Sequence, residues 1–471
     1  MRALCLLYGS ASARAGPLAG ALLVAGLITV TVCARVSSEP QRAIEIHPFT
    51  TEASCDEEFV RVARSLQPGD ELILRGGTYS QRCQRRIEGI HGTAQRPIII
   101  RAAVGERAIL TRPRGATGEY AQNNLEIANS SHLVIRGLEL AGGSIGIRFF
   151  GPLERITFED NEVHGTDNNA VAMNSGNSDG FVIRRNHIHH TGLLPRSLGG
   201  TEGEGLYVGC HDGSCIGSNH LIENNHIHHL RGTSEGGNDG IEIKLGSHGI
   251  VVRDNVIHHT NIGTSYPCIF VYGGGPRVNV VERNVMWACG EAIQVASDAI
   301  VRNNIILNSD VGITSGPHRQ VPKVRRVRIV NNTLYGHREC LHLRWQDASE
   351  MVLANNAVYC GGAIGIDGEG VGGAGVQVRA NVIAGAVLGP SLDALRFAKG
   401  GRADQMFRGP NGWDFWPKPE GQLVRVGAPE WTPEDDFNRV QRARPYDVGA
   451  YQSGGRPANS GWKIVPGFKE S

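Results

Sequence analysis

The pattern that decides the fold is seen in Leu221-Ile-Glu-Asn-Asn-His-Ile-His-His229 and its near copy Val251-Val-Arg-Asp-Asn-Val-Ile-His-His259. Both contain the order apolar, any, polar, Asn, any, apolar. The same order recurs at intervals of 20 to 39 residues around Asn161, Asn186, Asn225, Asn255, Asn284, Asn304, Asn332, Asn356 and Asn381. A repeat of this length indicates stacked units, because one unit cannot bury its apolar face alone.

Each interval also contains a second short apolar block. These blocks are Ala170–Met173, Gly205–Val208, Gly240–Ile243, Cys268–Val271, Ala292–Val295 and Cys340–Leu343. Two or three short strands per repeat, without a helical period, predict an all-β fold, a right-handed parallel β-helix of about ten coils. Asn suits such a repeat because it tolerates left-handed backbone conformations and its amide can bond to the Asn one coil away.

A helix is predicted before the repeat, and it is expected to cover the N-terminal end of the solenoid. Ser54 can cap this helix, which has acidic residues in its first turn. Its apolar residues Phe59, Val62, Ala63 and Leu66 share one face. An uncovered end would expose unpaired backbone groups and favour aggregation.

The stretches Pro68-Gly-Asp-Glu-Leu-Ile-Leu-Arg-Gly-Gly-Thr-Tyr79 and Pro97-Ile-Ile-Ile-Arg-Ala102 resemble the first coils of the pectate-lyase-like superfamily. The resemblance covers residues 50 to 390, and Asp447-Val-Gly-Ala-Tyr451 resembles a closing motif of such proteins. Residues 391–471 are predicted to form an irregular C-terminal cap. Sugar binding by its tryptophans is the alternative; they are Trp413, Trp416, Trp431 and Trp462.

Residues 1–34 are predicted to be an export signal, because Arg2 and Arg14 precede an apolar run that ends in Val32-Cys33-Ala34. Cleavage after Ala34 is expected, with an uncleaved anchor as the alternative. Residues 35–53 then form a linker, and residues 54–390 the β-helix domain with its N-terminal cap. The protein is expected to be secreted, periplasmic or on the cell surface.

Eight cysteines follow the export signal, an even number that favours disulfides in an exported protein. Three of the four sequential gaps approximate one repeat. The predicted pairs are Cys55 with Cys83, Cys210 with Cys215, Cys268 with Cys289, and Cys340 with Cys360. Buried free thiols are the alternative. The long interval between Asn186 and Asn225 holds the Cys210–Cys215 pair in a projection that can wall a groove.

Charge is balanced, with 47 Lys plus Arg against 46 Asp plus Glu, which argues against a nucleic-acid partner or an anionic membrane. We expect a monomer. The chain shows no serine-nucleophile, phosphate-loop or dinucleotide motif.

Aligning the second block of each repeat identifies the outward side chains, since alternate residues of a strand face opposite sides. If Ile241 and Ile243 are buried, Glu242 and Lys244 are exposed. On neighbouring coils the same positions are held by Tyr207, Phe270, Tyr272, Gln294, His342 and Arg344. Asn169, Glu204 and Asp239 align where the strands start. Such a track suits an extended polysaccharide, and a solvated face with incidental ion pairs is the alternative.

Histidines follow the repeated Asn on three successive coils. They are His187, His189, His190, His226, His228, His229, His258 and His259. We expect a surface ladder; a metal site is the less favoured interpretation, because zinc sites usually bring their own loop geometry and carboxylates that bond to the ligating histidines.

The stretch Asn238-Asp-Gly-Ile-Glu-Ile-Lys-Leu-Gly-Ser247 is similar to the acidic strand of calcium-dependent polysaccharide lyases of the chondroitinase B and alginate lyase type. The resemblance implies β-elimination on an acidic, uronate-containing polysaccharide. It implies Ca²⁺ held by Glu204, Asp239 and Glu242, Lys244 as base and Tyr272 as proton donor. A cation beside Lys244 favours its neutral amine.

One departure is that no arginine is found on the adjacent coil, since Arg344 lies about four coils, on the order of 19 Å, away. Two other functions stay open. A non-catalytic glycan-binding or surface protein would keep the aromatic track without needing Lys244. A glycoside hydrolase or epimerase would use Asp239 with Glu242 or Glu204.

Overall fold

The computed structural model of the chain describes residues 42–48, 57–80, 84–114, 122–198, 200, 203–231, 237–260, 266–390, 392 and 397–454. All of these residues belong to the second of two compact units, which begins at residue 41. The predicted export signal, Ser54, the Cys55–Cys83 pair and Trp462 lie outside the described residues. Within the described residues, no helix combines the length and apolar character needed to cross a membrane.

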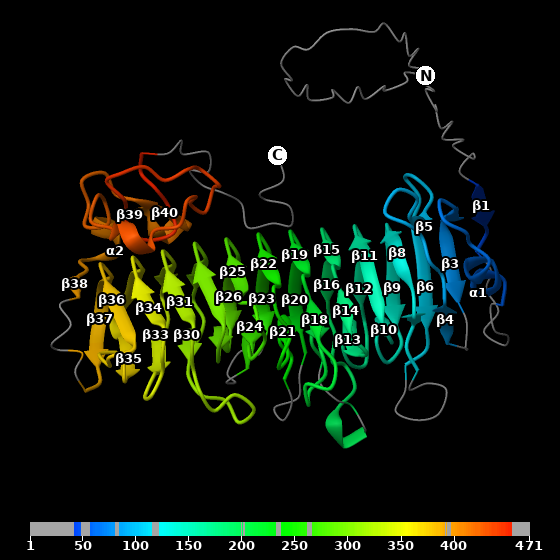
Figure 1. Cartoon of the computed structure of the whole chain (residues 1–471). Coiled ribbons are helices and arrows are strands. Elements are labelled where there is room, and N and C mark those ends of the chain that lie inside the picture. Colours follow the sequence, from blue (N-terminus) through cyan, green and yellow to red (C-terminus); the bar gives the residue numbers. More distant parts are fainter. Residues whose placement is uncertain are drawn as a thin grey trace, which may run out of the picture. The chain divides into compact units, whose positions relative to one another are not determined.

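The strands stack in three parallel columns, and successive coils lie side by side in chain order (Figure 1). The first column is β1 (Ala43–Ile46), β2 (Glu71–Leu74), β5 (Ile98–Ala102), β8 (Ser131–Arg136), β11 (Leu153–Glu159), β15 (Val182–Arg184), β19 (Leu221–Glu223), β22 (Val251–Arg253), β25 (Asn279–Glu282), β28 (Ala299–Arg302), β31 (Val327–Val330), β34 (Met351–Ala354) and β36 (Val376–Arg379). The short β14 (Ser178–Asp179) and β18 (Gly217–Ser218) extend it. Counted over the described residues, this column has more strands than the ten coils predicted, because the first coils precede the Asn repeat.

The second column follows the repeated Asn. It is β3 (Gly77–Ser80), β6 (Ala108–Arg112), β9 (Leu138–Gly142), β12 (Glu162–His164), β16 (His187–His189), β20 (His226–Leu230), β23 (Val256–Thr260), β26 (Val285–Cys289), β29 (Ile305–Leu307), β32 (Thr333–Tyr335), β35 (Ala357–Glu369), β37 (Val382–Leu388) and β38 (Ala398–Lys399).

The third column holds the second apolar block of each repeat. It is β4 (Arg85–Glu88), β7 (Leu125–Ala128), β10 (Ile147–Phe150), β13 (Val171–Ser175), β17 (Leu206–Val208), β21 (Ile241–Ile243), β24 (Pro267–Val271), β27 (Glu291–Val295), β30 (Val311–Ser315) and β33 (Glu339–Arg344). The long β35 pairs with both β32 and β33 and so joins the second and third columns.

One continuous apolar core fills the inside of the coils, with side chains from strands of all three columns. Ile222 of the first column, Ile227 of the second and Ile243 of the third are all fully buried in it. This alternation of inward apolar and outward polar residues is what the strand period demands.

An uninterrupted ladder of asparagine amides joins the coils, as the repeat predicted. The backbone N–H and the Nδ2 amide of Asn255 both donate to Oδ1 of Asn284, each at 3.0 Å, and its Nδ2 also donates to the carbonyl of Ile222 at 3.0 Å. The same bonds recur at each ladder position from Asn161 to Asn356, and Asn381 is the last acceptor.

The left-handed turn residue is not the ladder Asn but the residue before it. For example, φ is 54° at Asn224 and 57° at Asp254, and among the described residues no ladder Asn has a positive φ. The left-handed residue turns the chain from the first column into the second, which directs the following Asn side chain into the stack. The side-chain amide of this Asn can therefore bond to backbone groups that lose their strand partners at the turn.

The N-terminal helix α1 (Glu57–Arg64) follows Ser54, as predicted for the helix before the repeat. Its residues Phe59, Val62 and Ala63, together with Leu66, are buried against the first coils. A second helix, α2 (Ala403–Met406), begins the C-terminal tail, followed by the antiparallel strands β39 (Phe407–Gly409) and β40 (Asp414–Pro417).

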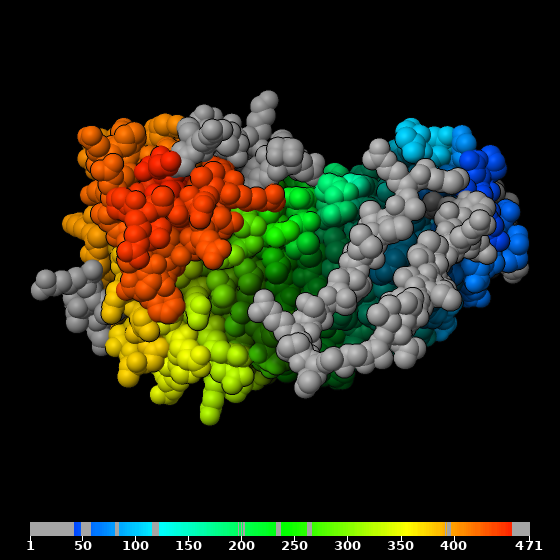
Figure 2. Space-filling view, turned by 45° about the horizontal axis from the view of Figure 1, so that its top comes forward, coloured from blue at the N-terminus to red at the C-terminus, as the bar shows by residue number. Residues whose placement is uncertain are grey.

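The C-terminal tail packs along the outer face of the second column. Phe407, Phe415 and Leu423 are buried in one cluster with Leu307 and Val382. Figure 2 shows the orange and red tail lying over the later coils. The described tryptophans of the tail take part in packing: Trp416 joins this cluster, and Trp431 packs under the guanidinium of Arg328.

The closing motif docks through its backbone. Nδ2 of Asn331 donates to the carbonyls of Asp447 and Gly449 at 3.2 and 3.1 Å. Gly449 has a φ of 95°, and a Cβ there would lie 3.0 Å from both Ala357 Cβ and Thr333 Oγ1. Glycine is therefore required at this position.

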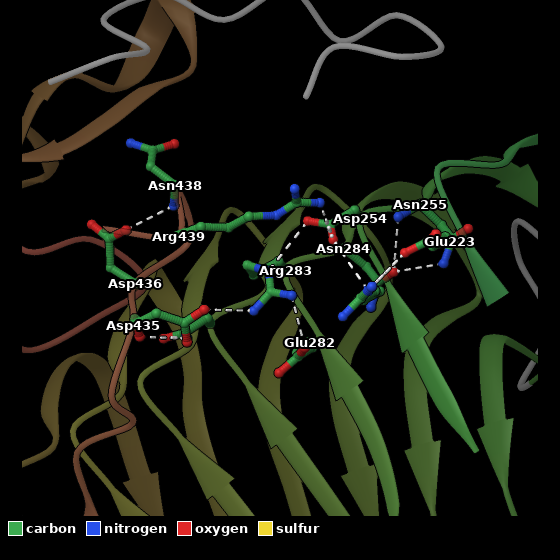
Figure 3. A network of polar contacts seen from close by, with 12 residues as sticks. Glu223, Asp254, Asn255, Glu282, Arg283, Asn284, Asp435, Asp436, Asn438 and Arg439 are labelled. Carbon is green, nitrogen blue, oxygen red and sulfur yellow. Dashed lines mark hydrogen bonds and ion pairs between the residues drawn. The ribbon is translucent and has the colours of Figure 1, made fainter. Parts of the chain in front are cut away.

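A network of charged side chains holds the tail to the turns of the solenoid (Figure 3). The guanidinium of Arg283, 4% exposed, donates to Asp254 at 3.3 Å, Glu282 at 2.7 Å and Asp435 of the tail at 2.8 Å. Arg439 of the tail reaches back to Asp254 at 2.9 Å. The ion pairs thus join residues that are more than 150 positions apart in sequence.

Replacing Arg283 with methionine is expected to lower the free energy of unfolding by about 3 kcal/mol, because buried carboxylates lose their partner. Limited proteolysis of the tail should also become faster. The matched control is Arg155→Met, which removes an exposed guanidinium 3.7 Å from Glu154. Equal proteolysis of the two variants would contradict a docking role for Arg283.

Three disulfides are present in the described residues, and their pairs are those predicted from the cysteine gaps. Cys210 bonds to Cys215, Cys268 to Cys289 and Cys340 to Cys360. The last two join the third column to the second column of the following coil.

Candidate functional site

One cavity of about 570 Å³ opens over the third column. Eight of the ten residues predicted for catalysis, substrate or metal line it: Glu204, Tyr207, Asp239, Glu242, Lys244, Phe270, Tyr272 and Gln294. Six further residues complete the lining: His211, Gly237, Tyr266, Glu291, His318 and Arg319. The structure therefore brings most of the predicted site together.

The strand register explains this convergence. Tyr207 pairs with Glu242, Glu242 with Phe270, and Phe270 with Gln294 on successive coils. Equivalent positions therefore stack in a straight outward track, at roughly 4.8 Å per coil.

His342 and Arg344 do not line the cavity. They lie further along the same track, where Thr314 separates His342 from Gln294. Nδ1 of His342 lies 2.7 Å from Oε1 of Glu339, and the guanidinium of Arg344 donates to Asp367 at 2.8 Å. Their substrate-binding role stays a prediction that the geometry does not favour.

Glu242 and Lys244 face outward as predicted, but the expectation that they are exposed is wrong. Glu242 is 4% exposed and Lys244 is 5% exposed. The ammonium of Lys244 lies between two aromatic rings, 4.8 Å from the centroid of Tyr207 and 4.7 Å from that of Tyr272. Rings from the neighbouring coils therefore cover charges that strand alternation alone would place in solvent.

Lys244, Glu242 and Tyr272 form a buried triad. The ammonium of Lys244 donates to Oε1 of Glu242 and, at 3.2 Å, to the hydroxyl of Tyr272. That hydroxyl in turn donates to Oε1 of Glu242 at 3.2 Å. Burial, with the nearby carboxylates of Glu242 and Asp239, raises the pKa of Tyr272. The phenol therefore keeps its proton at neutral pH and can serve as an acid.

Two buried carboxylates lie beside the triad. Glu204 is 1% exposed and Asp239 is 2% exposed. A Cβ on Gly237 would lie 3.6 Å from Oε1 of Glu204 and 3.7 Å from Oδ1 of Asp239, so both face the same small space. Paired carboxylate oxygens suit Ca²⁺, which prefers oxygen ligands.

Glu242 fits the predicted calcium site less well, because its Oε1 is held by Lys244. In the part of the chain that the structure describes, the possible ligand atoms of Glu204, Asp239 and Glu242 do not all lie within 4.8 Å of one another. Glu204 and Asp239 are thus the better-placed pair of the three.

Glu291 was missed by the sequence analysis, although the same alignment contains it. Pro267 lies one coil after Asp239, and Glu291 pairs with Pro267 one coil further on. Glu291 therefore continues the line of strand starts that begins with Glu204. Burial raises the pKa of Glu291 to about 7; Glu339 adds to the rise and the Thr314 hydroxyl opposes it. Extending the alignment by two coils would have found this residue.

The raised pKa of Glu291 gives a pH-dependent stability. Its folded pKa of about 7 exceeds the ordinary value of 4.5, so its favourable contribution is full well below pH 4.5 and is lost as the pH rises through 7. Glu291→Gln should leave the free energy of unfolding nearly unchanged at pH 4, below both pKa values, and raise it by about 2 kcal/mol at pH 8, after discounting for partial exposure. Urea denaturation at both pH values checks this, with Glu154→Gln as an exposed control; the same change in both variants would contradict it.

Two loops wall the cavity, and repeat analysis predicted only one of them. His211 lies in the loop closed by Cys210 and Cys215, as expected of that projection. His318 and Arg319 lie in a tight turn after β30, and the side chain of Gln320 in this turn donates to the carbonyl of His211. The two loops therefore meet across the cavity.

The turn after β30 brings a cation that the predicted track lacked. Arg319 lines the cavity from a position that no strand alignment includes. The ring of His318 packs edge-on against Tyr272, with centroids 4.7 Å apart. Burial, together with Lys244 and Arg319, lowers the pKa of His318, so its imidazole is neutral at pH 7.

A larger groove of about 850 Å³ lies elsewhere, lined by residues such as His91, Asn177 and Asp179. Its described lining contains no Lys or Arg, and Asp179 is bonded to Ser218 and Asn219. It lacks a paired base and acid, so the cavity at Lys244 is the better candidate.

Comparison with known proteins supports the architecture. The family profile described as "Right handed beta helix region" matches residues 119–313. This chain has the right-handed parallel β-helix fold. Comparison with the curated proteins returned no match.

Solved structures similar to this β-helix include an alginate lyase from Paenibacillus sp. str. FPU-7, with a TM-score of 0.50, 19% identity, and coverage of 65% of this chain and 99% of that one. Pectate lyase Pel9A has a TM-score of 0.50 and 11% identity, covering 88% and 97%. XylC in complex with xylose has a TM-score of 0.52 and 11% identity, covering 83% and 94%. At these identities the similarity shows the fold alone.

Proposed function

We propose that the protein is a polysaccharide lyase that cleaves an acidic, uronate-containing polysaccharide by β-elimination. The observation that carries the proposal is the buried triad of Lys244, Glu242 and Tyr272 in a cavity with two further carboxylates and Arg319. β-Elimination needs a base, an acid and a positive charge for the substrate carboxylate, and the cavity offers each of these.

Lys244 is the base in this proposal and Tyr272 the acid. The neutral amine of Lys244 takes the proton from the carbon beside the uronate carboxylate, and that electron pair forms the new C=C bond. The bond to the glycosidic oxygen breaks, and the Tyr272 hydroxyl protonates the departing oxygen. Oε1 of Glu242, already bonded to the Lys244 ammonium, is the acceptor for the proton that Lys244 must first lose. Tyr272 cannot exchange roles with Lys244, because its raised pKa keeps the phenol protonated at neutral pH and a protonated phenol cannot accept a proton.

Arg319 is placed to pair with the substrate carboxylate, since it is exposed at the wall of the cavity. Glu204 and Asp239 would hold Ca²⁺, and Glu242 would stay bonded to Lys244 as the acceptor of its proton. A bound Ca²⁺ would supply positive charge against the substrate carboxylate and favour loss of the adjacent proton. Tyr207 and Phe270 then offer apolar surface for sugar rings.

A hydrolase is the second candidate, favoured by Glu291. A carboxyl with a pKa of about 7 can donate a proton near neutral pH, and Asp239 is a carboxylate of the same line of strand starts. A non-catalytic glycan-binding protein would need neither residue.

The three functions differ in their products. Purified full-length protein is incubated with alginate, pectate, chondroitin and neutral xylan, with and without EDTA. A lyase produces ultraviolet absorbance from the unsaturated sugar together with new reducing ends, and a hydrolase produces reducing ends alone. Binding without either signal would identify a glycan-binding protein. Elimination that is lost with EDTA and restored by Ca²⁺ is the expected result; absence of elimination on every uronate polymer would refute the proposal.

A further inference from the structure

The histidine ladder, defined as His187, His189, His190, His226, His228, His229, His258 and His259, lies on the second column, on strands other than those of the cavity. Strand pairing places His226 beside His187, and His228 beside both His189 and His258. Their rings stack nearly parallel, with centroids 5.0 to 5.3 Å apart and interplanar angles of 5° to 6°. The expected surface ladder is therefore present.

Several ring nitrogens of the ladder lie within 3 Å of a ring nitrogen of another ladder histidine. Nε2 of His187 lies 2.8 Å from Nε2 of His228, and Nε2 of His226 lies 2.9 Å from Nε2 of His258. The turn histidines repeat this, with Nδ1 atoms 2.7 Å apart between His228 and His229. These close contacts join atoms that are all good ligands for metal ions.

Two groups of three histidines have ligand atoms within 4.8 Å of one another and share no residue. One is His187, His226 and His228, and the other is His229, His258 and His259. Tetrahedral zinc with Zn–N bonds of about 2.0–2.1 Å needs nitrogens roughly 3.3 Å apart, which lies within the range these groups span.

A carboxylate lies beside one histidine of the first group. Oε1 of Glu162 lies 3.6 Å from Nδ1 of His187, which belongs to the first group, and 3.1 Å from Nε2 of His189, a neighbour outside the group. A carboxylate on the second nitrogen orients a ligating imidazole and increases its basicity.

The imidazoles are also in the protonation state that metal binding requires. Burial, with neighbouring histidines, lowers the pKa of His226 to about 4 and that of His258 to about 3. Both rings are thus neutral at pH 7, and a cation need not displace a proton from them.

We propose that the histidine ladder binds borderline divalent cations of the Zn²⁺, Ni²⁺ and Cu²⁺ class at two positions, one held by His187, His226 and His228 and the other by His229, His258 and His259. Imidazole ligands select this class over Ca²⁺ and Mg²⁺, which prefer oxygen. These sites are separate from the carboxylates at the cavity, so the proposal does not depend on the proposed lyase activity.

Calorimetric titration of the full-length protein with ZnCl₂ tests the proposal. The protein must carry no affinity tag of histidines and must first be stripped with a chelator and dialysed. Saturable binding of two ions per chain is expected, with dissociation constants in the micromolar range or tighter. Cobalt should give the strong visible absorption of tetrahedral coordination. Binding only weaker than about 100 µM, or an octahedral cobalt spectrum, would overturn the proposal.

Single substitutions separate the two positions. His187→Asn should remove one ion and His259→Asn the other, and both are mild changes because the two side chains are partly or largely exposed. The matched control is His91→Asn, an exposed histidine that contacts Ser131 and lies outside the ladder. Circular dichroism and the thermal midpoint confirm folding. Two ions retained by both ladder variants would refute the assignment.

Discussion

Replacing Lys244 with methionine is expected to lower kcat/KM for elimination by about 100- to 10,000-fold, the range of a lost general base. The methionine side chain preserves most of the volume between the rings of Tyr207 and Tyr272. Initial rates of unsaturated-product formation measure the effect. Substrate binding should be retained, since the aromatic lining of the cavity is unchanged.

Two further variants protect this test from a folding artefact. Tyr272→Phe keeps the ring but removes the hydroxyl that bonds to Lys244 and Glu242, so it should also lose elimination while the thermal midpoint stays close to that of the natural protein. His342→Ala is the matched control, because His342 lies on the same track but outside the cavity. Full elimination activity in Lys244→Met would show that another group is the base.

Replacing Asn255 with alanine is expected to lower the free energy of unfolding by about 3–5 kcal/mol, an effect as large as that of truncating a buried apolar side chain to alanine. The substitution deprives the N–H of Asn225 of its acceptor at 2.9 Å and the carbonyl of Ile222 of a donor at 3.0 Å, both inside the stack. Buried groups without a partner pay the full cost of desolvation. Urea denaturation followed by circular dichroism measures the change.

The control for Asn255 is Asn411→Ala in the C-terminal tail, where the side chain is exposed and a change within about 0.5 kcal/mol is expected. Asn284→Ala, one coil further on, should be as damaging as Asn255→Ala, because its amide makes the same bonds. A loss below 1 kcal/mol in both ladder variants would mean that apolar stacking alone holds the coils.

Much of the candidate site was predictable because a parallel solenoid repeats its register. Once Asn225 and Asn255 set the coil boundaries, residues at equal offsets must stack. Tyr207, Glu242 and Phe270 were therefore aligned correctly. The same rule would have identified Glu291 if the alignment of strand starts had been extended.

The burial of Lys244 and the position of Arg319 were not predictable in this way. Strand alternation says which face a side chain is on, but not what covers that face. Arg319 lies in a turn whose length differs from those of other coils, and its path depends on contacts such as that between Gln320 and the carbonyl of His211.

The sequence by itself determined the fold, the asparagine ladder and the track of outward residues, since these follow from a period that every coil repeats. Only the tertiary structure decided which outward residues meet in a cavity, that the tail docks through Arg283, and that the histidine nitrogens converge. The physical reason is that backbone pairing between coils is periodic and local. Loops, tails and side-chain rotamers are instead set by non-repeating contacts between residues far apart in sequence.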